Sequence, residues 1–191
     1  MTQPRGQHHL RLISEPAEAP SDGELLARVA AGDLGALGRL YDSYAAMLLR
    51  FARRLGAGEE SEDVVQNVFL RLVRLAPQFD PAATSARPWL FAITVRVVQE
   101  RRRSLRRLSS ALKALTHQKQ SHATTSRPAA SDLEQCLQRL SLPKRSVMLL
   151  AEVEGFSCPE IAAMLEIPVG TVWTRLHHAR RELRAAWGET P

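Results

Sequence analysis

Hydrophobic residues in this sequence recur at helical spacing over most of its length. Between residues 37 and 55, the apolar positions recur at i+3 and i+4 spacing along one helix face: Leu37, Leu40, Tyr41, Tyr44, Leu48, Phe51, Ala52 and Leu55. The same spacing returns at Val64, Val65, Val68, Phe69 and Leu72, and again at Leu90, Ile93 and Val97. No segment keeps the two-residue alternation of a half-buried strand. The sequence therefore predicts an all-α chain.

Capping residues and helix breakers predict where the first helices begin and end. Ser21 or Asp22 starts a short helix that stops near Gly32, and Asp33 caps a longer one that breaks at Gly56 and Gly58. Ser61 opens a third helix. An ordered loop follows at 76–87, and Pro88 then lies in the first turn of a fourth helix.

The segment 109–130 differs from both of its neighbours. It has no acidic residue, little bulky apolar content and many Ser, Thr and Ala residues, which is typical of a flexible linker. We expect it to join two small helical domains, at 21–108 and 131–188. Residues 1–20 lack the apolar core of a secretory signal and are predicted to be a disordered leader.

The second domain carries the pattern of a helix-turn-helix motif. Two capping boxes, Ser131 with Glu134 and Ser157 with Glu160, start helices in it. Pro143 begins another helix, which ends at Gly155. A short helix at 158–165 and a turn at 166–168 then lead into a longer helix.

That last helix has one apolar and one polar face. Val172, Leu176, Ala179 and Leu183 fall within about 60° of one another and form the core seam. The opposite face is polar and basic and includes an exposed Trp173. Such a helix can be a plain solvated surface, but the capping boxes, the turn and the tryptophan favour insertion into a DNA groove. At its head, Gly170 lets the backbone approach phosphate or the preceding helix closely.

A second basic helix is predicted at 96–108, where six arginines stand against one glutamate. One interpretation is that this helix is a solubilising face or an RNA-binding tail. Because the loop 76–87 and Trp89 come just before it, a strand that follows the arginines would pass an aromatic-edged pocket, which suits single-stranded DNA with an unstacked base. The acidic segment 59–66 either stabilises a helix dipole or faces a protein.

Composition excludes several classes of protein. The net charge of +6 favours a polyanionic partner. Apolar runs such as 89–93 and 147–151 are far shorter than the roughly 20 residues of a membrane span. Cys136 and Cys158 have no CxxC partner, and no spacing of histidine, cysteine and acid suggests a metal site or a nucleophile. We expect a cytoplasmic protein with no enzymatic activity, metal or cofactor.

Four motifs in order resemble those of the sigma-70 family of bacterial RNA polymerase sigma factors, most of all its small extracytoplasmic-function (ECF) group, which keeps only domains two and four. They are EDVVQNVF at 62–69, RPWLFAI at 87–93, EGFS with EIA at 154–162, and GTV with TRL and AR at 170–180. The resemblance covers about residues 22–187. It implies a subunit that directs core polymerase to promoters, and an anti-sigma factor as a further partner.

The resemblance also implies site residues. Core polymerase would contact Glu62, Asp63, Val65, Gln66 and Phe69. The melted −10 strand would meet Phe79, Asp80, Arg87, Trp89, Arg96, Arg101, Arg102 and Arg103. The −35 duplex would meet Gly170, Thr171, Trp173, Thr174, Arg175, His177, His178 and Arg181. Arg96 and Glu100 stand where the family usually has Asn and Asp, and Trp173 where a basic residue is common.

One alternative has a similar outline: a helix-turn-helix activator with an N-terminal sensing domain. It predicts a ligand pocket or a phosphoacceptor site within residues 22–107. The sequence there has neither a glycine-rich cradle nor an acidic cluster followed by strands.

Overall fold

The computed structural model describes residues 20–80, 83, 85–115 and 132–186, and every regular element within them is a helix. The prediction of an all-α chain is confirmed. Residues 1–19 of the predicted leader, most of the predicted linker and Ser131 lie outside the described residues.

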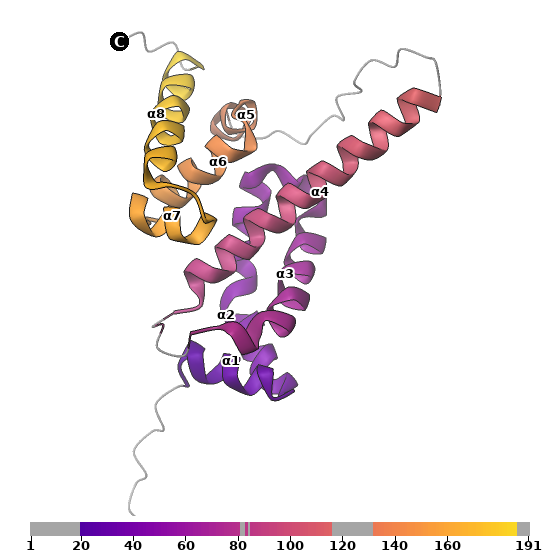
Figure 1. Ribbon diagram of the computed structural model, residues 1–191, viewed down its shortest axis with the longest axis vertical. Helices are drawn as coiled ribbons and strands as arrows, with labels where there is room; N and C mark the ends of the chain where they lie inside the picture. The colour runs from indigo at the N-terminus through magenta and orange to yellow at the C-terminus, as the bar shows by residue number, and fades with distance from the viewer. Residues whose placement is uncertain (1–19, 81–82, 84, 116–131, 187–191) are drawn as a thin grey trace, which may run out of the picture.

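The first unit consists of four α-helices that pack in chain order (Figure 1). They are α1 (Asp22–Ala30), α2 (Leu34–Ala52), α3 (Ser61–Leu75) and the long α4 (Arg87–Leu115). A π-helical turn (η1, Arg53–Ala57) and a 3-10 turn (η2, Gly58–Glu60) join α2 to α3, and a second 3-10 turn (η3, Ala76–Gln78) follows α3. The expected seams of α3 and α4 are buried.

Local capping fixes the start of these helices. Ser21 and Glu24 form a capping box at α1. The Asp33 carboxylate accepts hydrogen bonds from the amides of Gly35 and Ala36 at 2.8 and 3.1 Å, and it pairs with Arg28. The hydrogen bond from Arg28 is the main reason why the pKa of Asp33 is lowered.

The second unit is built on the predicted helix-turn-helix. It comprises α5 (Asp132–Arg139), α6 (Leu142–Met148) with a π-helical continuation (η4, Leu149–Val153), α7 (Cys158–Leu165) and α8 (Val169–Ala186). Ser157 and Glu160 form the expected capping box, and α6 and α7 both pack on α8. Glu166 ends α7 in a left-handed conformation, with φ of 54°.

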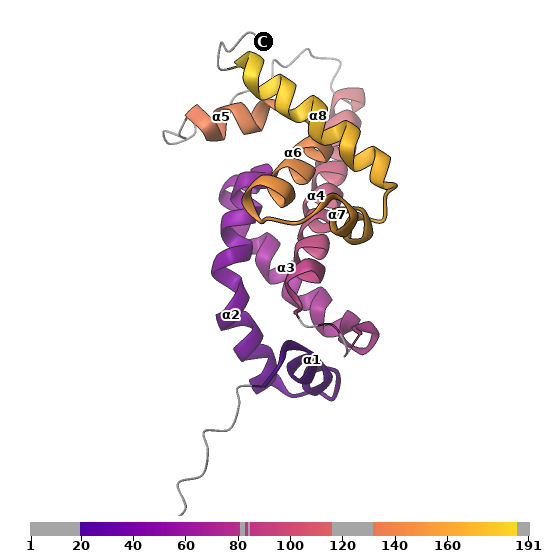
Figure 2. The same ribbon diagram turned by 90° about the vertical axis from the view of Figure 1, so that its left-hand side faces the viewer.

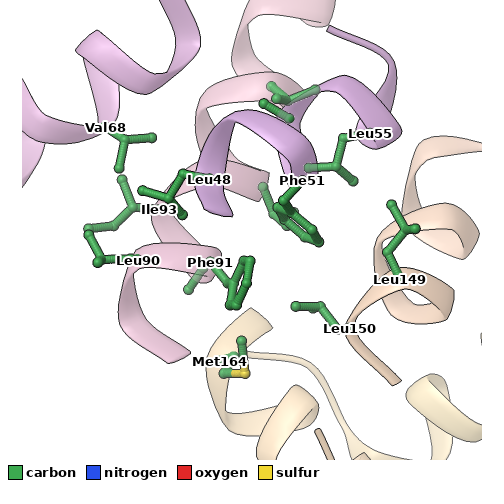
Figure 3. Close-up of a cluster of buried hydrophobic side chains, with 14 of the residues drawn as sticks. Leu48, Phe51, Leu55, Val68, Leu90, Phe91, Ile93, Leu149, Leu150 and Met164 are labelled. Atoms are coloured by element: carbon green, nitrogen blue, oxygen red, sulfur yellow. The ribbon is translucent and has the colours of Figure 1, made fainter. Parts of the chain in front are cut away.

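The two units pack against each other through a shared apolar cluster. Phe51 of α2 and Phe91 of α4 lie edge to face with ring centroids 4.6 Å apart, and Phe156 approaches Phe91 at 5.7 Å from the second unit. Figure 3 shows Leu150 and Met164 pointing into the same cluster from the second unit. Both units therefore contribute to one core.

A buried arginine ties the units together beside this core. Arg145 of α6 is 1% exposed and donates hydrogen bonds to the carbonyls of Gln138 and Leu140 in its own unit. It also donates to the Leu55 carbonyl of the first unit at 2.8 Å. Arg102 of α4 reaches the same carbonyl at 3.2 Å.

Two details differ from the sequence prediction. Helix α4 continues through Leu115, so the first residues of the segment predicted as linker are helical. That stretch, SSALKAL, contains good helix formers and extends an existing helix, which needs no new nucleus. Tyr41, expected in the α2 seam, is 46% exposed and covers the ring of Phe69 at the edge of the core.

Substituting Gly56→Ala should separate the two units. Its φ is +92°, and an added Cβ would lie 2.4 Å from Arg102 Nη2, 2.5 Å from Arg145 Nη1 and 2.6 Å from Gln138 Oε1. Gly32→Ala is the matched control, because Gly32 has nearly the same φ, +91°, but a Cβ there meets nothing within 4 Å. A positive φ costs an alanine about 1–2 kcal/mol at either position. We expect G56A alone to increase the radius of gyration measured by small-angle scattering, and to lower Tm more than G32A. The same radius of gyration and the same Tm in both variants would contradict the close approach of Gly56 to the second unit.

Candidate polymerase and nucleic-acid interface

The polar face of α8 is exposed as predicted. Val172, Leu176, Ala179 and Leu183 are buried, so the opposite side of the helix faces solvent. The exposed residues include Trp173, which is 58% exposed, and Thr174, His177 and Arg181. His178 is half-buried, and its ring lies 5.6 Å from that of His177. These side chains form one continuous surface.

Three residues predicted on this face have more specific positions. The Thr174 hydroxyl donates to the Gly170 carbonyl at 2.8 Å, within the helix. A Cβ at Gly170 would meet nothing within 4 Å, so this glycine does not serve close packing on the preceding helix. Arg175 is half-buried and lines a cavity between the two units. It therefore lies at the edge of the polar face of α8, which we call the recognition face, and not on it.

Phe79 and Trp89, expected beside the −10 strand, lie together. Their ring centroids are 5.2 Å apart, and both side chains are half-buried. The start of α4 is held by Asp22, whose carboxylate accepts hydrogen bonds from the Ala86 amide at 2.7 Å and from the Tyr44 hydroxyl. Burial is the main cause of the raised pKa of Tyr44, and the Asp22 carboxylate adds to it. The aromatic pair thus stands on a fixed framework.

The arginines of α4 point in two directions. Arg101 faces α3 and pairs with Glu60 at 2.7 Å and with Asp63 at 3.2 Å. Arg96, Arg102 and Arg103 lie on the other side and line the cavity between the units. Arg96 pairs there with Glu166 at 2.6 Å, whereas Arg103 is exposed.

Arg87, at the first turn of α4, contacts the second unit. Its guanidinium donates to the Glu154 carboxylate at 2.8 Å and to the Glu154 carbonyl at 3.1 Å. It also lies over the rings of Phe91 and Phe156, at 5.3 and 4.9 Å from their centroids. In this arrangement Arg87 serves the contact between the units and is not available to a DNA strand.

The expected polymerase-binding residues divide by exposure. Glu62, Asp63 and Gln66 are exposed on α3. Val65 and Phe69 are 3% and 6% exposed, so they belong to the core and shape the helix without offering atoms to a partner.

Leu70 and Val73 are exposed apolar residues that the sequence analysis missed, 64% and 39% exposed. They lie four and seven residues after Gln66 and therefore on the same face of α3. This helical spacing is the sequence signal that could have revealed them. The exposed face of α3 is therefore acidic at its start and apolar further on.

The described residues contain no cluster of histidine, cysteine and acidic side chains suited to a metal ion. Within the same part of the chain, no helix combines the length and the apolar character needed to cross a bilayer.

Two family models match the chain. The model of sigma-70 region 2 matches residues 40–108, and that of sigma-70 region 4 matches residues 130–183. These ranges fall on the first and second helical units.

Individual relatives agree with these matches. The ECF RNA polymerase sigma factor SigL of Mycobacterium tuberculosis is 33% identical over 172 residues, which cover 83% of this chain and 94% of SigL. Among solved structures, CnrH in complex with the cytosolic domain of CnrY is similar with a TM-score of 0.64 and 28% identity, over 90% of this chain and all of CnrH.

A second structure, the sigma factor RpoE of Bartonella quintana in complex with the anti-sigma factor NepR, shares the fold with a TM-score of 0.62 and 21% identity. It covers 81% of this chain and 98% of RpoE. With both region models in order and a relative of matching length, this chain belongs to the sigma-70 family of RNA polymerase sigma factors, in its ECF group.

Proposed function

We propose that this chain directs core RNA polymerase to specific promoters, with the first unit capturing the melted −10 strand and the second reading the −35 duplex. The observation that carries this proposal is the pair of basic helices, α4 and α8, one in each of the two sigma-70 regions. Such a protein acts by binding and catalyses no reaction itself. Because core polymerase works on chromosomal DNA, its place is the cytoplasm.

Core polymerase binds the exposed face of α3 in this proposal. Glu62, Asp63 and Gln66 offer charge and hydrogen bonds, and the exposed Leu70 supplies apolar area beside them. An interface of this kind combines a small apolar anchor with a polar rim.

The −10 strand binds along α4. The half-buried pair of Phe79 and Trp89 offers an aromatic surface for an unstacked base, and Asp80 follows it directly. Arg96, Arg102 and Arg103 continue along one side of the helix and suit the phosphates. Arg96 must leave Glu166 for this, and Arg87 must leave Glu154, so strand capture requires the units to move apart.

The −35 duplex binds the exposed face of α8. Trp173, Thr174, His177 and Arg181 point away from the core seam, and the N-terminal half of a recognition helix is the part that meets base edges. At the head of the helix, the exposed Gly170 leaves room for a phosphate. The Thr171 amide already donates to the Pro168 carbonyl at 2.9 Å, so Thr171 would contact the duplex through its side chain.

A protein that inhibits the chain is a further proposed partner. Both similar structures described above were solved as complexes with a second protein, and NepR is an anti-sigma factor. The exposed surfaces of α3 and α8 are available for such a partner in this chain.

The alternative of an activator with an N-terminal sensing domain is not favoured. Its first domain would be unrelated to sigma-70 region 2, whereas the region 2 model matches residues 40–108. Run-off transcription with purified core polymerase separates the two functions. A sigma factor yields promoter-dependent transcripts with core alone, and an activator yields none without another sigma factor. The absence of any such transcript from genomic templates would refute the proposal.

Removing the Leu70 side chain should weaken polymerase binding without destabilising the fold. A buried leucine contributes about 1.5–3 kcal/mol to an interface, so L70A should lower affinity for core polymerase by about tenfold or more. In V65A, by contrast, loss of a core side chain should lower the free energy of unfolding by about 2 kcal/mol. Fluorescence anisotropy with labelled chain measures affinity, and urea unfolding measures stability. Wild-type affinity in L70A would exclude Leu70 from the interface.

Arg181→Gln should weaken −35 binding more than Arg180→Gln does. Both arginines are exposed on α8, but Arg180 pairs with Glu152 and turns away from the recognition face. If Arg181 meets a phosphate, its loss lowers the slope of log affinity against log salt by about one, whereas R180Q keeps the wild-type slope. Holoenzyme binding to a promoter duplex over a salt series measures both. Identical salt slopes in the two variants would show that Arg181 does not contact a phosphate of the −35 duplex.

A further inference from the structure

A cavity of about 620 Å³ lies between the two units. On one side is α4, and on the other are the start of α6, the end of α7 and the first half of α8. These helices of the second unit lie beside α4 in Figure 1 and in front of it in Figure 2. We call this space the interdomain cavity. Its volume is in the range that holds one small organic ligand.

Its charged side chains are all positive. Six arginines line it, four from the first unit and two from the second: Arg96, Arg102, Arg103, Arg106, Arg145 and Arg175. No aspartate or glutamate is among the described residues that line it. Arg103, Arg106 and Arg175 form no ion pair with any residue that the structure describes.

Enclosure strengthens the mutual repulsion of these charges. Coulomb energy rises as the effective dielectric constant falls, so like charges around a partly closed space oppose one another more than on an open surface. The pKa of Arg102 is lowered, first by burial and then by the charge of Arg106. Glu166 pairs with Arg96, and the Glu100 carboxylate interacts electrostatically with Arg96 and Arg103, but neither acid lines the cavity, so positive charge dominates its walls.

The neutral groups around the arginines complete a ligand site. The amide Nε2 of Gln138 is buried and donates no hydrogen bond to any described residue. Apolar walls are formed by Val95, Leu140, Leu142, Pro143, Leu165 and Ile167. Guanidinium forks match phosphate oxygens, and apolar walls suit a flat organic group.

We propose that the interdomain cavity binds a small polyphosphorylated ligand, a nucleoside polyphosphate or an inorganic polyphosphate chain. The size of the cavity favours such a ligand over a nucleic-acid strand or an acidic peptide. Because both units contribute arginines, the ligand holds the units together. It thereby stabilises the arrangement seen in this structure, in which the two units are in contact and which we call the closed arrangement. Arg96, Arg102 and Arg103 are the same side chains proposed for the −10 strand, so the ligand and promoter DNA compete.

Binding is tested by isothermal titration calorimetry on the full chain, without DNA or polymerase, at about 150 mM KCl to screen weak surface binding. The small probes are inorganic triphosphate, GTP, ATP and unphosphorylated guanosine, and the macromolecular controls are a single-stranded DNA oligonucleotide and poly-glutamate. We expect saturable binding of one triphosphate-bearing molecule per chain and no binding of guanosine. Tighter binding of a nucleotide than of inorganic triphosphate identifies the nucleoside form, and equal binding identifies the inorganic chain.

Two variants test the location. R103Q/R106Q should weaken binding at least about tenfold, because each lost arginine removes charge-assisted hydrogen bonds. R39Q/R50Q removes the same charge from exposed positions on α2 that do not line the cavity, and it should bind within about twofold of wild type. Circular dichroism confirms that both variants fold. The ligand should also raise Tm in the wild type and in R39Q/R50Q, but not in R103Q/R106Q.

Three results overturn the proposal: no saturable binding of any phosphorylated probe, equal loss in the two double variants, or binding only of single-stranded DNA or poly-glutamate. Because polymerase is absent from these measurements, they leave the promoter-directing function untouched. A failure of run-off transcription would in turn leave the ligand site standing.

Discussion

The buried guanidinium of Arg145 is the interaction on which the arrangement of the two units depends. A cation taken out of water is costly unless hydrogen bonds replace its hydration. Arg145 obtains them from the Gln138 and Leu140 carbonyls, the Gln138 side chain and, across the junction, the Leu55 carbonyl. This is possible because Gly56 has no Cβ and holds a φ of +92°. The apolar cluster around Phe51 and Phe91 then closes beside it.

Most of the fold could be predicted from the sequence because its signals are local. Asp33, Ser157 with Glu160, and Pro88 each act within one helical turn, and all of them lie where the patterns placed them. The contact between the units could not be predicted. Arg87 meets Glu154 67 positions further along the chain, and no spacing rule links them. The length of α4 was also missed, because a short run of Ser, Ala and Leu resembles a linker when considered apart from the helix that precedes it.

The candidate site was predicted only in part, because one motif can serve both folding and binding. In α3 the helical spacing placed Val65 and Phe69 inward, while the family resemblance placed the same residues at a partner. Their burial favours the first interpretation. Exposed Leu70 lies outside the residues singled out from the motif, although it shares the exposed face of α3 with Gln66. The helical pattern of one sequence does not distinguish residues that pack in the core from residues that bind a partner. The exposure of each side chain in the structure does.

Charge on α4 links the closed arrangement to DNA binding. Closing the units gains apolar burial and the hydrogen bonds of Arg145, but it also brings arginines of both units around one cavity. Opening relieves that repulsion and exposes the same arginines to a polyanion outside. Under the two proposals above, an anion in the cavity favours the closed form, and a DNA strand along α4 favours the open one. The balance between them is set by differential binding, so a modest change in the concentration of either anion shifts it without any change in the fold.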